Sequence, residues 1–224
     1  YSFNHLAVPS ICNRMMSTMF ETQPAAIRKI IYRLLILRRV RYQWVHGDRE
    51  YPLLRHLVEP AESSVDVGAN TGVYTWWLAR LSRKVYAFEP NPQLAKLLRE
   101  TFGKRVEVHA CGVSDAADTL KLWIPRRGER ELVGRSSMMP EAIDEFELRS
   151  IDVPVRTLDS LALDDVGFVK AHAEGHEFAI LQGARQTLER CRPTVMVAAQ
   201  SRFTREDPER IDAFLQALGY RGYF

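Results

Sequence analysis

The amino-acid sequence predicts an α/β fold: a doubly wound, mostly parallel sheet with helices on both faces, preceded by a helical arm and carrying a β-hairpin and lid insertion. Three observations lead to this prediction. Short apolar segments alternate with helical segments of about ten residues from residue 50 onward, which is typical of βαβ units. A glycine-rich turn follows the first apolar segment, at residues 68–72. The chain has 224 residues, 46% hydrophobic and 26% charged, so it can bury one core, and this composition excludes disorder or coiled coil as the main architecture.

The helical arm is expected over residues 1–49. Apolar residues recur at helical spacing over residues 24–42, with Pro24 in the first turn and arginines interleaved. Residues 1–45 hold seven basic side chains and one acidic one, whereas the rest of the chain is net acidic. The arginines interrupt any long apolar run, so this helix is not expected to span a membrane. Two interpretations stay open: the helix docks on the domain or on a partner, which we favour, or it lies on a membrane surface as a basic amphipathic helix.

The main domain is expected over residues 50–224. Its first part alternates helices at 50–58, 73–81 and 92–102 with strands at 63–67, 84–88 and 106–111. Each strand is a short apolar run, and the second one is stopped by Glu89 and Pro90. Strands separated in this way by helices predict a parallel sheet that is covered on both faces.

The alternation breaks after residue 111 and resumes near residue 167. Residues 119–124 and 151–156 both have the pattern of strands, and the polar stretch between them is long for a compact domain. We therefore expect a hairpin and lid insertion over residues 118–156. The alternation continues with a strand at 167–172, a helix at 177–189, a strand at 194–199 and a helix at 208–218. Residues 221–224 have the pattern of one more strand, which would make the C-terminus a truncated one.

The cysteines and the charge balance limit the cellular compartment and the kinds of partner that we expect for this protein. Cys12, Cys111 and Cys191 are odd in number, far apart and in no CxxC pair, so they predict buried thiols in a reducing compartment rather than a disulfide or zinc framework. Because the chain also shows no secretory signal, we expect a cytoplasmic protein. The net acidic main domain argues against a nucleic-acid partner.

Residues 66–72 predict a site for a nucleoside cofactor. Gly68 allows a tight turn, and Gly72 opens a helix whose free N–H groups attract a carboxylate or phosphate. Glu89 ends the next strand beside this turn, where its carboxylate can accept both ribose hydroxyls of an adenosine. The expected cofactor contacts here are Asp66, Gly68, Asn70, Thr71, Gly72 and Glu89.

The middle of the turn discriminates between adenosine cofactors. Asn70 stands where a dinucleotide fingerprint needs glycine to admit a pyrophosphate, but its side chain can hydrogen-bond an amino-acid moiety. The spacing therefore favours S-adenosylmethionine over NAD. We expect Asp66 near the ammonium group of the cofactor, and the amides at the start of the next helix near its carboxylate.

Several ordered motifs resemble those of the FkbM family of S-adenosylmethionine-dependent methyltransferases. They are Asp-Val-Gly-Ala-Asn-Thr-Gly at 66–72, Phe-Glu-Pro at 88–90, Val-Ser-Asp at 113–115, Leu-Asp-Ser-Leu at 158–161, Glu-Gly-His-Glu at 174–177 and Leu-Gln-Gly-Ala at 181–184. The resemblance covers roughly residues 50–220, and the block at 158–184 is its most specific part. It implies a class I methyltransferase (Rossmann-like) fold and O-methylation of a hydroxyl of a sugar, glycolipid or natural-product small molecule. It also implies that Ser114 and Asp115 lie near the adenine. Ser136, Ser137 and Lys170 would contact the small-molecule or glycan acceptor.

Two positions differ from the usual pattern of that family, and both fall at carboxyl ends of predicted strands, where α/β sheets build their sites. His172 stands where the family usually has an acid. The strand after Pro193 usually ends in a glutamate in that family, but here its end, with Ala198, has none. Imidazole is a competent base at neutral pH, so His172 is a candidate general base. Glu174, two residues further on and therefore expected on the same face of the strand, would orient His172 or the substrate.

Other interpretations of these residues stay open. His172 would otherwise fill a polar pocket in a catalytically weakened module that binds the cofactor, or act with Glu174 in substrate binding alone. His172, Glu174 and His176 also form a His-x-Glu-x-His pattern, but Gly175 is expected to end the strand and turn His176 away, so no metal is expected.

Overall fold

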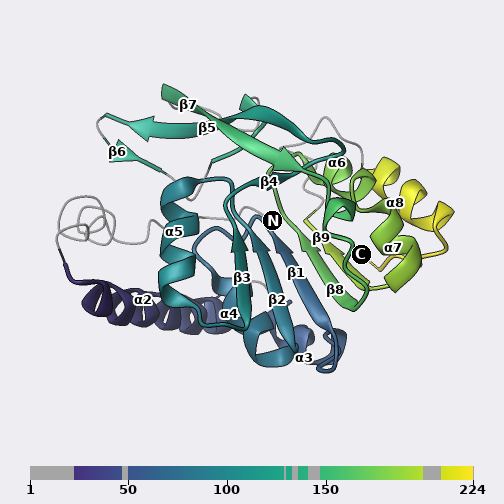
Figure 1. Ribbon diagram of the computed structural model, residues 1–224, viewed down its shortest axis with the longest axis horizontal. Helices are drawn as coiled ribbons and strands as arrows, with labels where there is room; N and C mark the ends of the chain where they lie inside the picture. The colour runs from purple at the N-terminus through teal and green to yellow at the C-terminus, as the bar shows by residue number, and fades with distance from the viewer. Residues whose placement is uncertain are drawn as a thin grey trace.

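In the computed structural model, which describes residues 23–46, 50–128, 130–132, 136–140, 147–198 and 208–223, a parallel sheet forms the centre of the fold (Figure 1). The described elements are, in chain order, α2 (Ala25–His46), η1 (Tyr51–Leu53), α3 (Leu54–Leu57), β1 (Ser63–Val67), α4 (Val73–Leu81), β2 (Lys84–Phe88), α5 (Pro92–Thr101), β3 (Val106–His109), β4 (Gly112–Val113), β5 (Asp118–Arg127), β6 (Arg130–Glu131), β7 (Glu147–Arg156), η4 (Asp159–Leu161), β8 (Val166–Ala171), α6 (Glu177–Gln182), α7 (Arg185–Cys191), β9 (Thr194–Val197) and α8 (Pro208–Ala217).

The central sheet has the strand order β3-β2-β1-β8-β9, and all neighbours are parallel. The chain winds from β1 outward to β3 and then returns to add β8 on the other side of β1. The strand order therefore reverses between β1 and β8. In open α/β sheets, ligands bind outside the carboxyl ends of the strands at such a point. The doubly wound α/β fold predicted from the sequence is confirmed.

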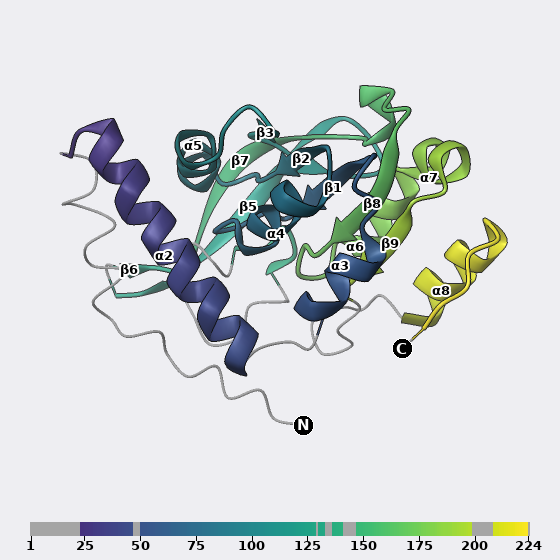
Figure 2. The ribbon, with the colours of Figure 1, turned by 90° about the horizontal axis from the view of Figure 1, so that it is seen from below.

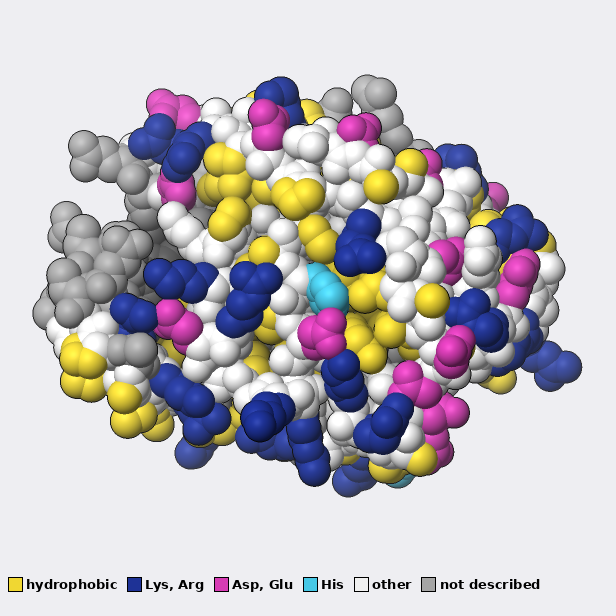
Figure 3. All heavy atoms as spheres, viewed as in Figure 1, with side chains coloured by type: hydrophobic (Ala, Val, Ile, Leu, Met, Phe, Trp, Pro, Cys, Tyr) yellow, Lys and Arg dark blue, Asp and Glu magenta, His cyan; other side chains and the backbone are white. Residues whose placement is uncertain are grey.

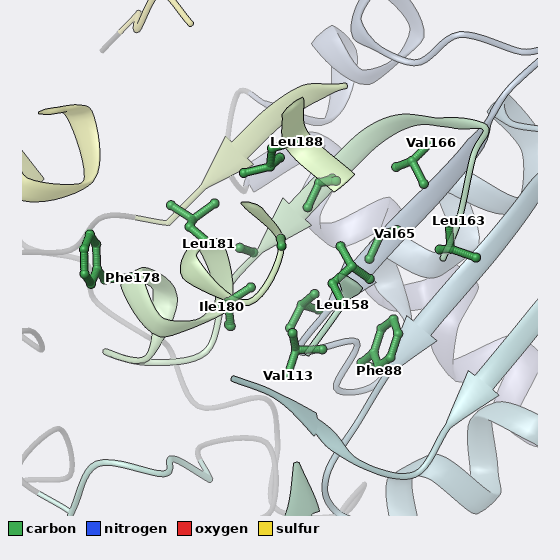
Figure 4. Close-up of a cluster of buried hydrophobic side chains, with 14 of the residues drawn as sticks. Val65, Phe88, Val113, Leu158, Leu163, Val166, Phe178, Ile180, Leu181 and Leu188 are labelled. Carbon is green, nitrogen blue, oxygen red and sulfur yellow. The ribbon is translucent and has the colours of Figure 1, made fainter. Parts of the chain in front are cut away.

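Helices cover both faces of this sheet, and side chains that alternate along the strands divide the core in two. Val65 of β1 packs with α6, α7 and α8, in the cluster drawn in Figure 4. Val85 of β2 and Phe168 of β8 point to the opposite face and pack with α2, α3 and α4. These two apolar layers fix the sheet from both sides and hold the carboxyl ends of its strands in place.

Helix α2, the described part of the predicted arm, docks on the domain. Tyr32, Ile36 and Val40 are buried, and the helix contacts α4 and α5. The guanidinium of Arg28 donates to both carboxylate oxygens of Glu100, at 3.1 and 2.8 Å. The favoured interpretation of the arm, a helix docked on the domain, is thus confirmed for one side of α2. No helix in the described parts of the chain combines the length and the hydropathy needed to cross a bilayer.

The insertion between the two halves of the sheet is built on a long antiparallel hairpin. Strands β5 and β7 pair from Asp118 with Val155 to Arg126 with Glu147, and the short β4 pairs in parallel with β7. Both hairpin strands are longer than predicted. Ser137 returns from the hairpin connection to exchange backbone hydrogen bonds with Trp123, at 2.7 and 3.0 Å. The connection is thereby attached to the edge of β5 that faces away from β7.

Several predicted elements are corrected. The single helix expected at 177–189 is two helices, because the side chain of Asp159 accepts from the backbone N–H groups of Gln186 and Thr187 and starts a new helix there. The helix expected at 50–58 is a 3-10 turn followed by one helical turn. The strands expected at 106–111 and 194–199 end at His109 and Val197.

The end of the chain also differs from the prediction. Residues 221–223, expected to form a strand, have no strand pairing. Instead the hydroxyl of Tyr220 donates to the carbonyl of Leu188, at 3.1 Å, and fixes this segment to α7. Cys111 and Cys191 are half-buried free thiols, and Cys12 lies outside the described residues.

Candidate functional site

A cleft of about 510 Å³ opens at the carboxyl ends of β1, β2, β8 and β9. This volume is in the range of small-molecule sites. The loops after these strands form its floor, α2 and the segment after it form one side, and the hairpin connection forms another. The lining residues include 67–71, 88–90, 112–113, 136–138, 170–174 and 196–198.

The turn after β1 can be built only with glycine. Gly68 has φ +73°, and a Cβ on it would lie 2.0 Å from the carbonyl oxygen of His172. The N–H groups of Gly68 and Ala69 both donate to the carbonyl of Phe88, at 3.0 Å. The turn is therefore held against both neighbouring strands, and its backbone faces the cleft.

Asp66 and Lys170 lie beneath this turn and are paired with each other. The carboxylate of Asp66 is fully buried, accepts from the hydroxyl of Thr75 at 2.6 Å and pairs with the ammonium of Lys170 at 3.1 Å. The same ammonium donates to the carbonyls of Val67 and Gly68, at 3.0 and 2.9 Å. The ammonium of Lys170 is thus engaged inside the protein, by one ion pair and two hydrogen bonds. Asp66 was expected at the cofactor ammonium and Lys170 at the acceptor; in the structure both contact each other beneath the turn, and Lys170 also lines the cleft.

Glu89 lies at the edge of the turn and lines the cleft. It is 5% exposed, and its two oxygens accept from the backbone N–H groups of Asn70 and Asn91, at 2.7 and 2.9 Å. Burial raises the pKa of the Glu89 carboxyl to about 7, although both hydrogen bonds oppose this shift. Each oxygen keeps a further lone pair, so the carboxylate can accept two hydroxyl groups from the cleft side. The residues present therefore fit a ribose diol.

Helix α2 also contacts this turn, and no feature of the sequence predicts that contact. The guanidinium of Arg39 donates to the hydroxyl of Thr71 at 2.9 Å, and the hydroxyl of Tyr32 donates to the Thr71 carbonyl at 3.1 Å. Burial raises the pKa of the Tyr32 phenol. Arg39 lines the cleft. The only signal in the sequence was the basic character of the arm, which does not say where the arm docks.

His172 and Glu174 come together in the cleft, but not for the reason expected. Strand β8 ends at Ala171, so the alternation of a strand does not apply to them. Instead Glu174 has φ +48° and Gly175 φ +101°, and this left-handed turn places Oε1 of Glu174 3.6 Å from Nε2 of His172. The two side chains are 37% and 34% exposed, so a ligand in the cleft can reach them.

Glu177 holds this loop in place and was missed as a functional residue. Its carboxylate is buried and accepts from the backbone N–H groups of Ala173 and Gly175, at 2.7 and 2.9 Å. Burial raises the pKa of the Glu177 carboxyl, and these hydrogen bonds oppose the shift. Its place in the Glu-Gly-His-Glu motif was the available signal.

Ser114 and Asp115 lie beyond the cleft wall, which is formed here by Gly112 and Val113. The hydroxyl of Ser114 lies 3.0 Å from Asp115 and 2.9 Å from Nε2 of His176. His176 is therefore engaged away from the pair of His172 and Glu174. No three His, Cys, Asp or Glu side chains form a metal-binding group within the described ranges.

The hairpin connection brings Ser136 and Ser137 to the cleft, on the side opposite α2. Ser137 is buried, its hydroxyl donates to the carbonyl of Glu174 at 3.0 Å, and it accepts from the N–H of Met139 at 2.9 Å. Ser137 thus fixes the connection to the loop after β8, and Ser136 is the serine that is half-buried at the cleft surface.

The family follows from a comparison with known proteins. The family model of the Methyltransferase FkbM domain matches residues 66–221. The chain belongs to the FkbM methyltransferase family. The matched range runs from the last two residues of β1 to four residues beyond α8 and so contains every strand loop that lines the cleft. The resemblance drawn from the sequence motifs is confirmed.

A solved structure shares the fold of this FkbM domain. The crystal structure of methyltransferase FkbM from Methylobacillus flagellatus KT superposes with a TM-score of 0.51 at 16% sequence identity, covering 92% of this chain and 52% of that one. The chain therefore spans about half the length of that protein. No curated protein matches the chain. In this FkbM domain His172 and Ala198, the two positions expected from the sequence to differ from the family's usual pattern, both line the cleft.

Proposed function

We propose that this chain is an S-adenosylmethionine-dependent O-methyltransferase that acts on a hydroxyl of a sugar, glycolipid or natural-product small molecule. The observation that carries the proposal is the placement of Glu89. Its buried carboxylate and the half-buried pair of His172 and Glu174 line one cleft, at the point where the strand order reverses. One side of the cleft suits a ribose, and the other offers a base for a hydroxyl group.

The cofactor would be held by the turn after β1 and by Glu89. Glu89 would accept the two ribose hydroxyls, and the backbone at Gly68, Asn70 and Gly72 would lie against the rest of the nucleoside. S-adenosylmethionine supplies an electrophilic methyl group carried on a sulfonium. The pyrophosphate of a dinucleotide would meet the side chain of Asn70, a residue whose backbone is in the left-handed conformation, φ +50°.

His172 is the proposed general base. A hydroxyl acceptor must lose its proton as its oxygen is methylated, and the free imidazole can take that proton. Glu174 lies 3.6 Å from Nε2 of His172, so its carboxylate would stabilise the imidazolium that forms. The carbonyl of His172 rests against Gly68, which fixes the distance between the base and the cofactor turn.

Two titrations and one variant test this function. Calorimetry with S-adenosylhomocysteine and with NAD should detect heat for the first ligand only. His172→Ala should abolish turnover of S-adenosylmethionine with a hydroxyl acceptor while cofactor affinity stays within about threefold, because His172 contacts the acceptor side. Turnover that is unchanged in His172→Ala would remove the base hypothesis, and no heat with S-adenosylhomocysteine would remove the cofactor.

A second function, a module that binds the cofactor with weakened catalysis, is favoured by one observation. Ala198 and His172 both line the cleft at positions where family members carry acids. This function predicts normal binding of S-adenosylhomocysteine without methyl transfer to any acceptor. Measuring affinity and turnover on the same preparation separates the two functions.

A further inference from the structure

Helix α2 has two apolar faces, and only one of them packs against other residues that the structure describes. The packed face holds Tyr32, Ile36 and Val40, which are at most 7% exposed. The opposite face holds four aliphatic side chains, named here the outer stripe: Ile27, Ile30, Leu34 and Leu37, which are 43%, 60%, 60% and 44% exposed. Their spacing of three and four residues aligns them along one side of the helix.

The exposure of large hydrophobic side chains is concentrated on this helix. Of the eight that are exposed within the described residues, five lie on α2, namely the outer stripe and Tyr42. Figure 3 shows hydrophobic side chains gathered at the lower left, where α2 lies in Figure 1, with Lys and Arg side chains beside them. Figure 2 shows α2 at the edge of the molecule, away from the sheet. A contiguous apolar patch of this kind marks a surface that binds something apolar.

The charge of α2 indicates which kind of partner this surface can bind. The helix contains six Lys and Arg residues and no Asp or Glu. Arg28 and Arg33 turn back to the domain, where they donate to Glu100 and to the carbonyl of Thr101. Arg38 and Arg41 are exposed and follow Leu34 and Leu37 by four residues, so they continue the line of the outer stripe.

We propose that the outer stripe binds α2 to the surface of an anionic lipid bilayer, with the helix lying along the headgroups. The four aliphatic side chains would enter the boundary of the acyl chains, and Arg38 and Arg41 would extend to the lipid phosphates. A second copy of the chain fits this face less well, because two strongly basic helices without acids would face one another. An acid-free apolar stripe with arginines at its end is complementary to anionic lipid.

The proposal is tested by co-sedimentation of the full chain with vesicles of phosphatidylcholine alone and of phosphatidylcholine mixed with phosphatidylglycerol. The wild-type chain should sediment with the mixed vesicles. Ile30→Glu/Leu34→Glu should lower that partition by at least about tenfold, because each aliphatic side chain loses its burial in lipid. Leu53→Glu/Leu57→Glu is the matched control: it adds the same charge at exposed leucines outside α2 and should leave the partition within about twofold.

A second variant tests the electrostatic half of the proposal. Arg38→Gln/Arg41→Gln should weaken binding to the mixed vesicles by about fivefold for each arginine, and raised salt should reduce this difference. Circular dichroism and thermal melting show whether each variant folds, and if the glutamate variant does not, the arginine variant and the salt dependence decide.

Three results would overturn the proposal. The first is that the wild-type chain does not sediment with the mixed vesicles. The second is that the wild-type chain and the variants of the outer stripe sediment equally. The third is that analytical ultracentrifugation finds a wild-type dimer and that Ile30→Glu/Leu34→Glu dissociates it. The last would identify a second copy as the cover of the stripe. None of these readouts depends on methyl transfer, so they are independent of the proposed function.

Discussion

Replacing Glu89 by glutamine should separate the nucleoside side of the cleft from the rest of the protein. The wild-type carboxylate is buried, has a pKa of about 7 and already accepts two backbone N–H groups. Two ribose hydroxyls would then be accepted by a charged group, and each such bond contributes roughly 1.5–3 kcal/mol. Because the amide has only one acceptor oxygen and no charge, we expect Glu89→Gln to bind S-adenosylhomocysteine on the order of a hundredfold more weakly.

The pH dependence of binding gives an independent measure of the same group. A carboxyl with a pKa of about 7 is about one tenth ionised at pH 6 and about nine tenths ionised at pH 8. Since only the ionised form offers acceptors to both hydroxyls, the affinity of the wild-type protein should rise about tenfold between these pH values. The affinity of Glu89→Gln should be flat over the same range. Isothermal titration calorimetry at pH 6, 7 and 8 measures both effects.

The stability of the protein without ligand should change with pH in the opposite sense. The pKa of Glu89 is raised in the folded state, so between about pH 4.5 and about pH 7 the folded chain keeps a proton that the unfolded chain releases. The contribution of Glu89 to stability is therefore complete below this range and is lost as the pH rises through it, by about 3 kcal/mol. Urea unfolding across the range should show this fall in the wild-type protein and not in Glu89→Gln.

A matched control is Glu107→Gln, which removes an exposed carboxylate on β3, outside the cleft. This variant should bind S-adenosylhomocysteine with wild-type affinity. If Glu89→Gln binds within about threefold of the wild-type protein, or if the wild-type affinity is flat between pH 6 and 8, the assignment of Glu89 to the ribose is refuted.

Three further substitutions test the walls of the cleft. Gly68→Ala should abolish folding or cost more than about 3 kcal/mol, since its Cβ would meet a backbone carbonyl at 2.0 Å, whereas Gly103→Ala, which faces open space, should change the urea midpoint little. Lys170→Met should lower the free energy of unfolding by about 3–5 kcal/mol, because Asp66 would be left as a buried charge without its cation; a loss under about 1 kcal/mol would contradict this pairing. Arg39→Ala should weaken the binding of S-adenosylhomocysteine by about tenfold, since Arg39 lines the cleft beside Thr71. The affinity for methylthioadenosine, which lacks the amino-acid carboxylate, should not change. Equal effects on both ligands in calorimetry would exclude a contact between Arg39 and that carboxylate.

Elements with strong local signals could be predicted closely from the sequence. The bounds of β1, α4 and β2 agree with the structure residue for residue, because a short apolar strand, a glycine turn and a Glu-Pro stop are all local features. Glu89 was correctly expected beside the turn after β1, since parallel strands that are neighbours in sequence pair in space.

The roles of Asp66 and Lys170 could not be predicted in this way. They are partners in the register of β1 and β8, and about a hundred residues of chain separate them. No local pattern says that an acid and a lysine will be brought together under a turn. The division of α6 from α7 has the same origin, because the cap from Asp159 comes from a different part of the chain.

The contact between the Gly68 α-carbon and the His172 carbonyl constrains how such a protein can change over evolutionary time. Neither segment can shift without displacing the other, so the geometry between the turn after β1 and the proposed base is expected to be inherited as one unit. In the described residues, the hairpin connection that carries Ser136 binds the loop after β8 through the hydroxyl of Ser137, and Ser137 is joined to β5 by two backbone bonds. New acceptor preferences are therefore expected to arise by exchange of side chains and lengths in the 118–156 insertion, while the opposite wall stays as it is.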